Sequence, residues 1–248
     1  MSGAWQRYPG ALVILGLLIL WEIAGELQLF AFLPSIREIV DAGVTLLERP
    51  DVWRSWGRTL LEVFVGTAIA VGLGFVLGVS MAQSRVVEAL FGLYVDLFQS
   101  APVSAFVPVI GLVFGLGYSA IVATVTIFAF FVFTVNTYTG VKNVDPRLIE
   151  MARSFGAGRV AVQFRVVIPA ARPMMLTGLG LAVGRGVNGG ILGEMLISIV
   201  GIGGLLMYYG GAFQEDFVFA LVFMVLIIAV VLMSLIQRLA DKYEERMR

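Results

Sequence analysis

The sequence predicts an all-α membrane protein that crosses the bilayer with six transmembrane helices. Hydrophobic residues make up 59% of the chain, and its mean hydropathy is +0.95. Only 14% of the residues are charged, whereas about 25% is usual in soluble domains. Uncharged runs are long enough for helices that need about 20 apolar residues to cross a membrane.

The six spans follow from these runs in order along the chain. The run from Leu97 to Val141 is too long for one crossing, and the glycines at 115 and 117 divide it. In the first span, Glu22 and Glu26 would reach the interface or face other helices. We expect one domain, residues 1–248, with spans at 9–31, 60–83, 89–111, 118–140, 173–196 and 217–237.

The first run has a second interpretation, a secretory signal peptide with Arg7 as its basic region. No small-x-small cleavage site follows the run, which continues as WEIAGELQLF. We therefore favour an uncleaved first helix.

The distribution of Lys and Arg predicts the orientation. With the N-terminus inside, twelve of these residues lie in cytoplasmic segments and four in outer ones. Because cytoplasmic loops carry an excess of Lys and Arg, both termini are expected in the cytoplasm. Residues 142–169 are then the largest cytoplasmic loop.

This loop has local helix signals. Asp145 is a good N-cap, and Pro146 suits the first helical position. Gly156 permits a bend, and Pro169 is expected to end the segment. We predict two short helices joined by a bend, which either lie on the membrane surface or dock a cytoplasmic partner.

Several classes of chemistry are disfavoured. The chain has no Cys and no His, so the commonest general base and the commonest transition-metal ligands are missing. Neither lysine, Lys142 or Lys242, follows the glycines of a P-loop. The sequence GRGVNG at 184–189 matches a dinucleotide fingerprint but lies inside a span. The net charge of zero gives no argument for a nucleic-acid partner.

Polar groups within spans are candidates for function, because charges in a membrane are costly. Arg185 and Asn188 share one face of the fifth span, and Glu194 lies near its end. Arg185 either lines a solute path together with Asn188 or forms an ion pair with Asp96 of the third span. Both interpretations stay open at the level of the sequence.

The cytoplasmic loop resembles a known motif. The pattern Glu150-x-Ala152-x3-Gly156, followed by Val167-Ile168-Pro169, is similar to the EAA loop of permeases in binding-protein-dependent ABC importers. Met151 replaces the first Ala of that motif. The segments FLPSIREIVDAGVTLL, PVSAFVPVIGLVFGLG and GEMLISIVGIGGLL resemble the nitrate/sulfonate/taurine-type permeases over nearly the whole chain.

The resemblance implies a type I ABC importer permease fold in the bacterial cytoplasmic (inner) membrane. It implies two cytoplasmic ATPase subunits that bind ATP and Mg, a second permease subunit (a copy or a paralogue) and an outer solute-binding protein. We expect lipid around the chain. We expect the chain itself to bind no cofactor or metal and to contain no catalytic residue. The residues that would couple to the ATPase are Glu150, Ala152, Arg153, Phe155, Gly156, Ile168 and Pro169.

The chain departs from the family where solute would pass. Relatives commonly have Arg-Pro shortly before the third-span proline, and here Gln99-Ser100 precede Pro102. The implied solute is a small nutrient of the nitrate/sulfonate/taurine or vitamin-precursor class. The candidate path residues are Arg185, Asn188, Gln99, Ser100 and Glu194.

A rival interpretation is a secondary transporter or channel subunit that works without an ATPase. It predicts inverted internal repeats, of which the sequence shows none that is convincing, and it leaves the large loop without a role. A membrane enzyme is disfavoured by the lack of His and Cys.

Overall fold

The computed structural model describes the backbone of residues 8–245 and the side chains of residues 12–238, and all regular secondary structure in this part of the chain is helical. The elements are α1 (Tyr8–Glu26), α2 (Ile36–Leu47), α3 (Pro50–Gln83), α4 (Arg85–Ser100), the 3₁₀ turn η1 (Val103–Phe106), α5 (Val107–Phe114), α6 (Tyr118–Lys142), α7 (Pro146–Ser154), α8 (Arg159–Val162), the π turn η2 (Gln163–Val167), α9 (Ile168–Gly193), the π turn η3 (Glu194–Ser198), α10 (Gly201–Gly211) and α11 (Glu215–Glu245).

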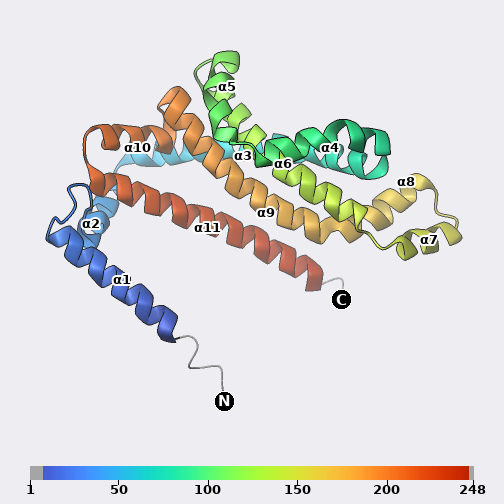
Figure 1. Ribbon diagram of the computed structural model, residues 1–248, viewed down its shortest axis with the longest axis horizontal. Coiled ribbons are helices and arrows are strands. Elements are labelled where there is room, and N and C mark those ends of the chain that lie inside the picture. Colours follow the sequence, from blue (N-terminus) through green and yellow to red (C-terminus); the bar gives the residue numbers. More distant parts are fainter. Residues whose placement is uncertain (1–7, 246–248) are drawn as a thin grey trace.

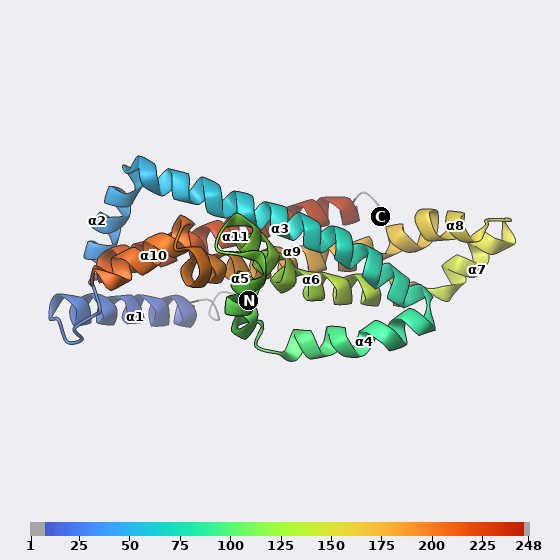
Figure 2. The same ribbon diagram turned by 90° about the horizontal axis from the view of Figure 1, so that it is seen from above.

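The helices α3, α6 and α9 form the centre of the molecule, with α6 packed along both of the others. Helices α2 and α10 lie at one end, and α7 and α8 form the other end (Figures 1 and 2). Helix α11 packs against α9, α2 and α10, whereas α1 extends away from the central helices (Figure 1).

Small residues allow the central helices to approach closely. A Cβ added at Gly66 of α3 would lie 2.6 Å from Val125 of α6, and one at Gly178 of α9 would lie 2.5 Å from Asn136 of α6. Such close backbone approach replaces the hydrophobic driving force that helices lack in lipid.

Four helical segments in the described part are long and apolar enough to cross a membrane: 50–83, 118–142, 159–198 and 215–238. The bent pair of α4 and η1–α5 would add a fifth. The first expected span, 9–31, begins at residues whose side chains lie outside the described part, and its helix ends at Glu26.

The third expected span, 89–111, is not one helix. Helix α4 ends at Ser100, and the next helical segment, which begins at Val103, is bent by 97° from it. Ala101 is extended, with ψ 150°, because the residue before a proline is disfavoured in the helical region. Pro102 therefore turns the chain inside the expected span.

The fifth span also differs from the expectation, because Pro169 does not end the helical segment. The π turn η2 lies directly before α9, and the Ile168 N–H bonds to the Gln163 carbonyl oxygen. This wider turn precedes the position where Pro169, lacking an N–H, could not complete the α-helical pattern. Residues 159–198 thus form one continuous helical segment.

The helices of the second and sixth expected spans are longer than the sequence predicted. The second span was expected at 60–83, but α3 begins at Pro50, which suits a first helical position. The sixth was expected at 217–237, and α11 covers Glu215–Glu245. Two helices, α2 and α10, were not predicted from the sequence. Helix α2 begins with a capping box between Ser35 and Glu38.

The core at the α2 and α10 end joins α2, α3, α10 and α11. Tyr209 of α10 is 2% exposed and stacks on Phe217 of α11 at 4.8 Å between ring centroids. Burial raises the pKa of the Tyr209 hydroxyl, so it stays neutral and accepts a hydrogen bond from Arg49 Nη1 at 2.9 Å.

Candidate functional site

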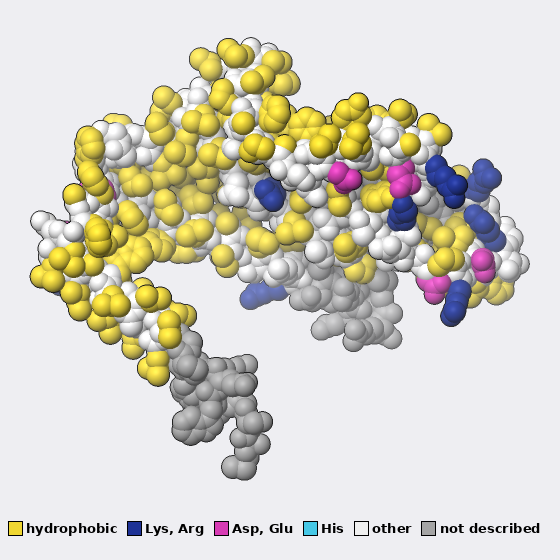
Figure 3. All heavy atoms as spheres, in the orientation of Figure 1, with side chains coloured by type: hydrophobic (Ala, Val, Ile, Leu, Met, Phe, Trp, Pro, Cys, Tyr) yellow, Lys and Arg dark blue, Asp and Glu magenta, His cyan; other side chains and the backbone are white. Residues whose placement is uncertain are grey.

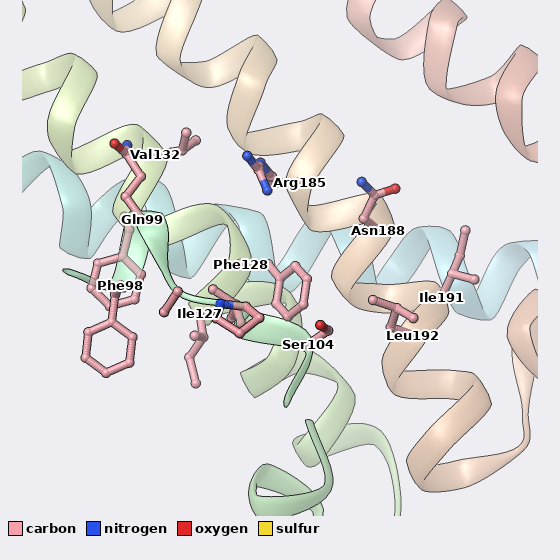
Figure 4. A pocket seen from close by; sticks show the side chains of 14 residues that line it. Phe98, Gln99, Ser104, Ile127, Phe128, Val132, Arg185, Asn188, Ile191 and Leu192 are labelled. Carbon is pink, nitrogen blue, oxygen red and sulfur yellow. The ribbon is translucent and has the colours of Figure 1, made fainter. Parts of the chain in front are cut away.

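A cavity of about 480 Å³ opens beside the bend between α4 and α5. Its walls come from the bend itself, from α6 and from α9 (Figure 4). Phenylalanine rings supply much of the apolar lining. The polar side chains in the lining are Gln99, Ser104, Arg185 and Asn188.

Arg185 and Asn188 of α9 both line this cavity. The two residues are one turn apart on α9, so they share a face, and Figure 4 shows both at the cavity wall. The neighbouring glycines pack instead: a Cβ at Gly186 would lie 2.7 Å from Thr67 Oγ1, and one at Gly189 2.8 Å from Phe128. The glycine face of α9 thus packs closely against α3 and α6, and the face with Arg185 and Asn188 borders the cavity.

The bend at Pro102 brings a second wall to the site. Gln99 lies in the last turn of α4, and Ser104 lies in η1. Non-helical backbone within a membrane is tolerated where it is buried in protein or lines a cavity. The Pro102 bend meets that condition, because residues 101–104 line the cavity. Ser104 was missed by sequence reasoning, although Pro102 was a visible signal.

The expected alternative of an Arg185–Asp96 ion pair is not formed. Both side chains are exposed in the single chain, and no pair within 4.0 Å joins them among the ion pairs of the described residues. The guanidinium of Arg185 therefore remains available in the cavity.

Two of the candidate path residues lie outside the cavity. Ser100 is exposed but is not part of the lining. Glu194 is completely buried in η3, where its carboxylate accepts hydrogen bonds from Thr59 Oγ1 at 2.6 Å and from the Gly203 N–H at 2.8 Å. Glu194 is a packed internal group in this structure and does not belong to the lining of the cavity.

The segment of residues 145–167, called the α7–α8 segment, forms the two short helices expected from the sequence. Asp145 Oδ1 accepts a hydrogen bond from the Arg147 N–H at 2.9 Å. Gly156 has φ 82°, the left-handed conformation that often ends a helix. Ile149 and Ala152 pack against a buried cluster that includes Val144 and Val167.

The candidate coupling residues divide between surface and interior. Glu150, Arg153, Phe155 and Gly156 are exposed, whereas Ala152, Ile168 and Pro169 are partly buried. Phe155 has the most exposed of these side chains, at 86%. Charged side chains gather at this end of the molecule, over α7 and α8 (Figure 3).

No group of three or more His, Cys, Asp or Glu in the described residues is arranged to hold a metal ion. The lining of the cavity offers one guanidinium, two amides, a hydroxyl and aromatic rings. Such groups can bind and orient a polar solute.

Comparisons with known proteins agree on one class. The model of the family described as "Binding-protein-dependent transport system inner membrane component" matches residues 70–248. The formylaminopyrimidine transport permease protein ThiX of Halalkalibacterium halodurans is 30% identical over 97% of this chain and 96% of its own length. The taurine transport system permease protein TauC of Escherichia coli is 26% identical, over 87% and 81%.

Solved structures show a similar fold. A chain of the MetNI methionine ABC transporter in an inward-facing conformation matches with a TM-score of 0.59 and 21% identity. The match covers 80% of this chain and 94% of that one. A chain of an amino acid ABC transporter matches with a TM-score of 0.60 at 20% identity.

Proposed function

Because the chain belongs to the family of binding-protein-dependent inner membrane transport components, we propose that the cavity around Arg185 is part of its solute path. The chain is the multi-pass permease subunit of an ABC importer, and such a system includes an ATPase and a binding protein. The permease component itself carries no ATPase activity. Family membership disfavours the rival interpretation of a transporter that works alone.

The observation that carries the path proposal is the guanidinium of Arg185, which forms no ion pair with any carboxylate among the described residues. It lies in the membrane-spanning part of α9 and borders the cavity. Charges at such depth usually face a water-filled pathway or a partner. Asp96, the candidate partner, makes no pair with it.

The solute we propose is a small nutrient that carries a negative charge or a carbonyl group. A cation in a low-dielectric site attracts anions and rejects cations, and the two amides beside it offer both donors and acceptors. The relatives named for taurine, aliphatic sulfonate and formylaminopyrimidine transport have solutes compatible with this lining.

The proposed solute class is tested by uptake in cells that produce the permease with its own ATPase and binding protein. Labelled taurine, a short alkanesulfonate, formylaminopyrimidine and a cationic amino acid are compared. We expect uptake of at least one of the first three and none of the cation. Uptake of the cation as the preferred solute would contradict the proposal.

The α7–α8 segment is the proposed docking site for the ATPase, and two ATPase subunits would serve two permease subunits. We propose six crossings with both termini in the cytoplasm, which places the α7–α8 segment on the ATPase side. The proposal is supported by the excess of Lys and Arg in the segments assigned to the cytoplasm. The second permease is a copy of this chain or a paralogue.

A further inference from the structure

The helix that carries Arg185 is broken directly after the cavity. Ile191 and Leu192 of α9 still line the cavity (Figure 4). The π turn η3 follows at Glu194, and the chain then turns into α10 (Figure 1). Ile199 at this break has φ 43°, a left-handed conformation that is rare for β-branched residues. Such a conformation persists only where the surrounding structure enforces it.

Two side chains from outside α10 hold its first turn. The N-cap of α10, Val200, makes no side-chain hydrogen bond. Instead, the Ile202 N–H donates to Thr59 Oγ1 of α3 at 3.0 Å. The Gly203 N–H donates to Glu194 Oε2 of η3 at 2.8 Å. The first N–H groups of a helix have no partner within it, so the start of α10 is fixed by α3 and η3.

The same two side chains also bond to each other. Thr59 Oγ1 lies 2.6 Å from Glu194 Oε1 and 3.1 Å from the Ser55 carbonyl oxygen. A hydroxyl has one proton to donate, so we assign it to the closer oxygen, that of Glu194. Gly201 permits this contact, because a Cβ there would overlap the Glu194 carboxyl group. The pair of Thr59 and Glu194 is called the latch.

The latch is inaccessible to water. The side chains of Thr59 and Glu194 are 3% and 0% exposed, and Ile202 beside them is completely buried. Without the latch, water could not take the place of the lost acceptors, and an unmade hydrogen bond of this kind carries the full cost of desolvation. The latch therefore joins α3, η3 and α10 more firmly than an exposed hydrogen bond would.

The turn η3 connects the latch to a second wall of the cavity. Ile197 of η3 packs in one buried cluster with Val107 of α5 and Ala120 of α6. A Cβ added at Gly111 of α5 would lie 3.3 Å from Ile197. Helix α5 follows the Pro102 bend, whose residues line the cavity. A shift of η3 would therefore affect the α9 wall and the wall at the bend together.

We propose that Thr59 and Glu194 are positioning residues for transport, and that their latch holds the two walls of the Arg185 cavity in place. The latch does so by fixing η3 and the start of α10 on α3. Neither side chain belongs to the cavity lining, so neither touches the solute. The inference rests on the proposed role of the cavity as part of the solute path.

The chain offers a matched set of variants. Thr59→Val removes the hydroxyl but keeps the shape of the side chain, whereas Thr59→Ser keeps the hydroxyl. The control is Thr124→Val. Thr124 is also completely buried, but its hydroxyl donates only within its own helix, to the Ala120 carbonyl oxygen at 2.8 Å. Glu194→Gln changes the other half of the latch, because only one oxygen remains for two donors.

Hydrogen exchange followed by mass spectrometry measures the latch in the full-length permease purified with its ATPase. In Thr59→Val we expect exchange at least about tenfold faster in residues 200–206 and 107–114, which corresponds to about 1.4 kcal/mol. Thr59→Ser and Thr124→Val should exchange like the natural chain. Because the latch acts as one unit, adding Glu194→Gln to Thr59→Val should accelerate exchange less than the two single effects combined.

Uptake into proteoliposomes then tests the role in transport. We expect the maximal rate to fall at least about tenfold in Thr59→Val and to be restored in Thr59→Ser. A loss of packing alone would not distinguish the hydroxyl in this way. Normal uptake in Thr59→Val, or equal loss of uptake in Thr59→Ser, would overturn the proposal.

The exchange measurement needs no solute, so it separates the latch from the solute path. Unchanged exchange in Thr59→Val would overturn the latch. Faster exchange confined to residues 200–206 would overturn its hold on the cavity wall, and so would equally fast exchange in Thr124→Val. Normal uptake in Arg185→Gln, together with lost uptake and faster exchange in Thr59→Val, would contradict the solute path and still support the latch.

Discussion

Phe155→Asp is expected to abolish ATP-driven uptake while the permease stays in the membrane. The Phe155 side chain is 86% exposed at the tip of the α7–α8 segment, so its replacement leaves the packing within the chain intact. Burial of a phenylalanine in a partner's groove contributes about 1.5–3 kcal/mol, and an aspartate there adds the cost of a buried charge. We expect the ATPase affinity to fall at least about a hundredfold, since each 1.4 kcal/mol is tenfold.

The measurement is copurification of the ATPase with the tagged permease, together with uptake. A matched control is Phe213→Asp, because Phe213 is 72% exposed between α10 and α11, at the opposite end of the molecule. That variant should retain the ATPase. If Phe155→Asp copurified with a natural amount of ATPase and transported normally, the docking site would lie elsewhere.

Arg185→Gln is expected to leave assembly intact and to reduce uptake of an anionic solute by about tenfold to a hundredfold. The range follows from about 1.5–3 kcal/mol for a hydrogen bond to a charged group and 1.4 kcal/mol for each factor of ten. Assembly should be unaffected because Arg185 forms no ion pair within the described chain. Arg185→Lys keeps the charge but loses the planar fork, so we expect partial uptake.

Asp96→Asn distinguishes a solute-path role of Arg185 from a structural ion pair between Arg185 and Asp96. Since Asp96 and Arg185 do not pair in the structure, the double variant should behave as the sum of the two single variants. Uptake and assembly are measured for all three. If Asp96→Asn restored assembly lost in Arg185→Gln, the two residues would be partners and the path role of Arg185 would be wrong.

The features that local sequence decides were predictable. Asp145 and Pro146 begin α7, and Gly156 bends the chain after it, because caps and backbone preferences act over a few residues. The spacing of Arg185 and Asn188 placed them on one face of a helix, and both line the cavity. Periodicity within one helix is enough for such an inference.

Features that depend on contacts between distant segments were not predictable in this way. Pro102 breaks one expected span, whereas Pro169 lies in a continuous helical segment because a π turn precedes it. Hydropathy does not distinguish these two outcomes. The burial of Glu194 depends on Thr59, 135 residues earlier in the chain. Pairing across such a distance has no signal in a single sequence.

Uptake into proteoliposomes tests the central claim most directly. The purified permease is reconstituted with its ATPase, its binding protein and a labelled solute from the panel above, with and without ATP. We expect solute uptake only when ATP and all the proteins are present. Uptake should be lost in Phe155→Asp and reduced in Arg185→Gln. Uptake by the permease alone, driven by an ion gradient without ATP, would contradict the account.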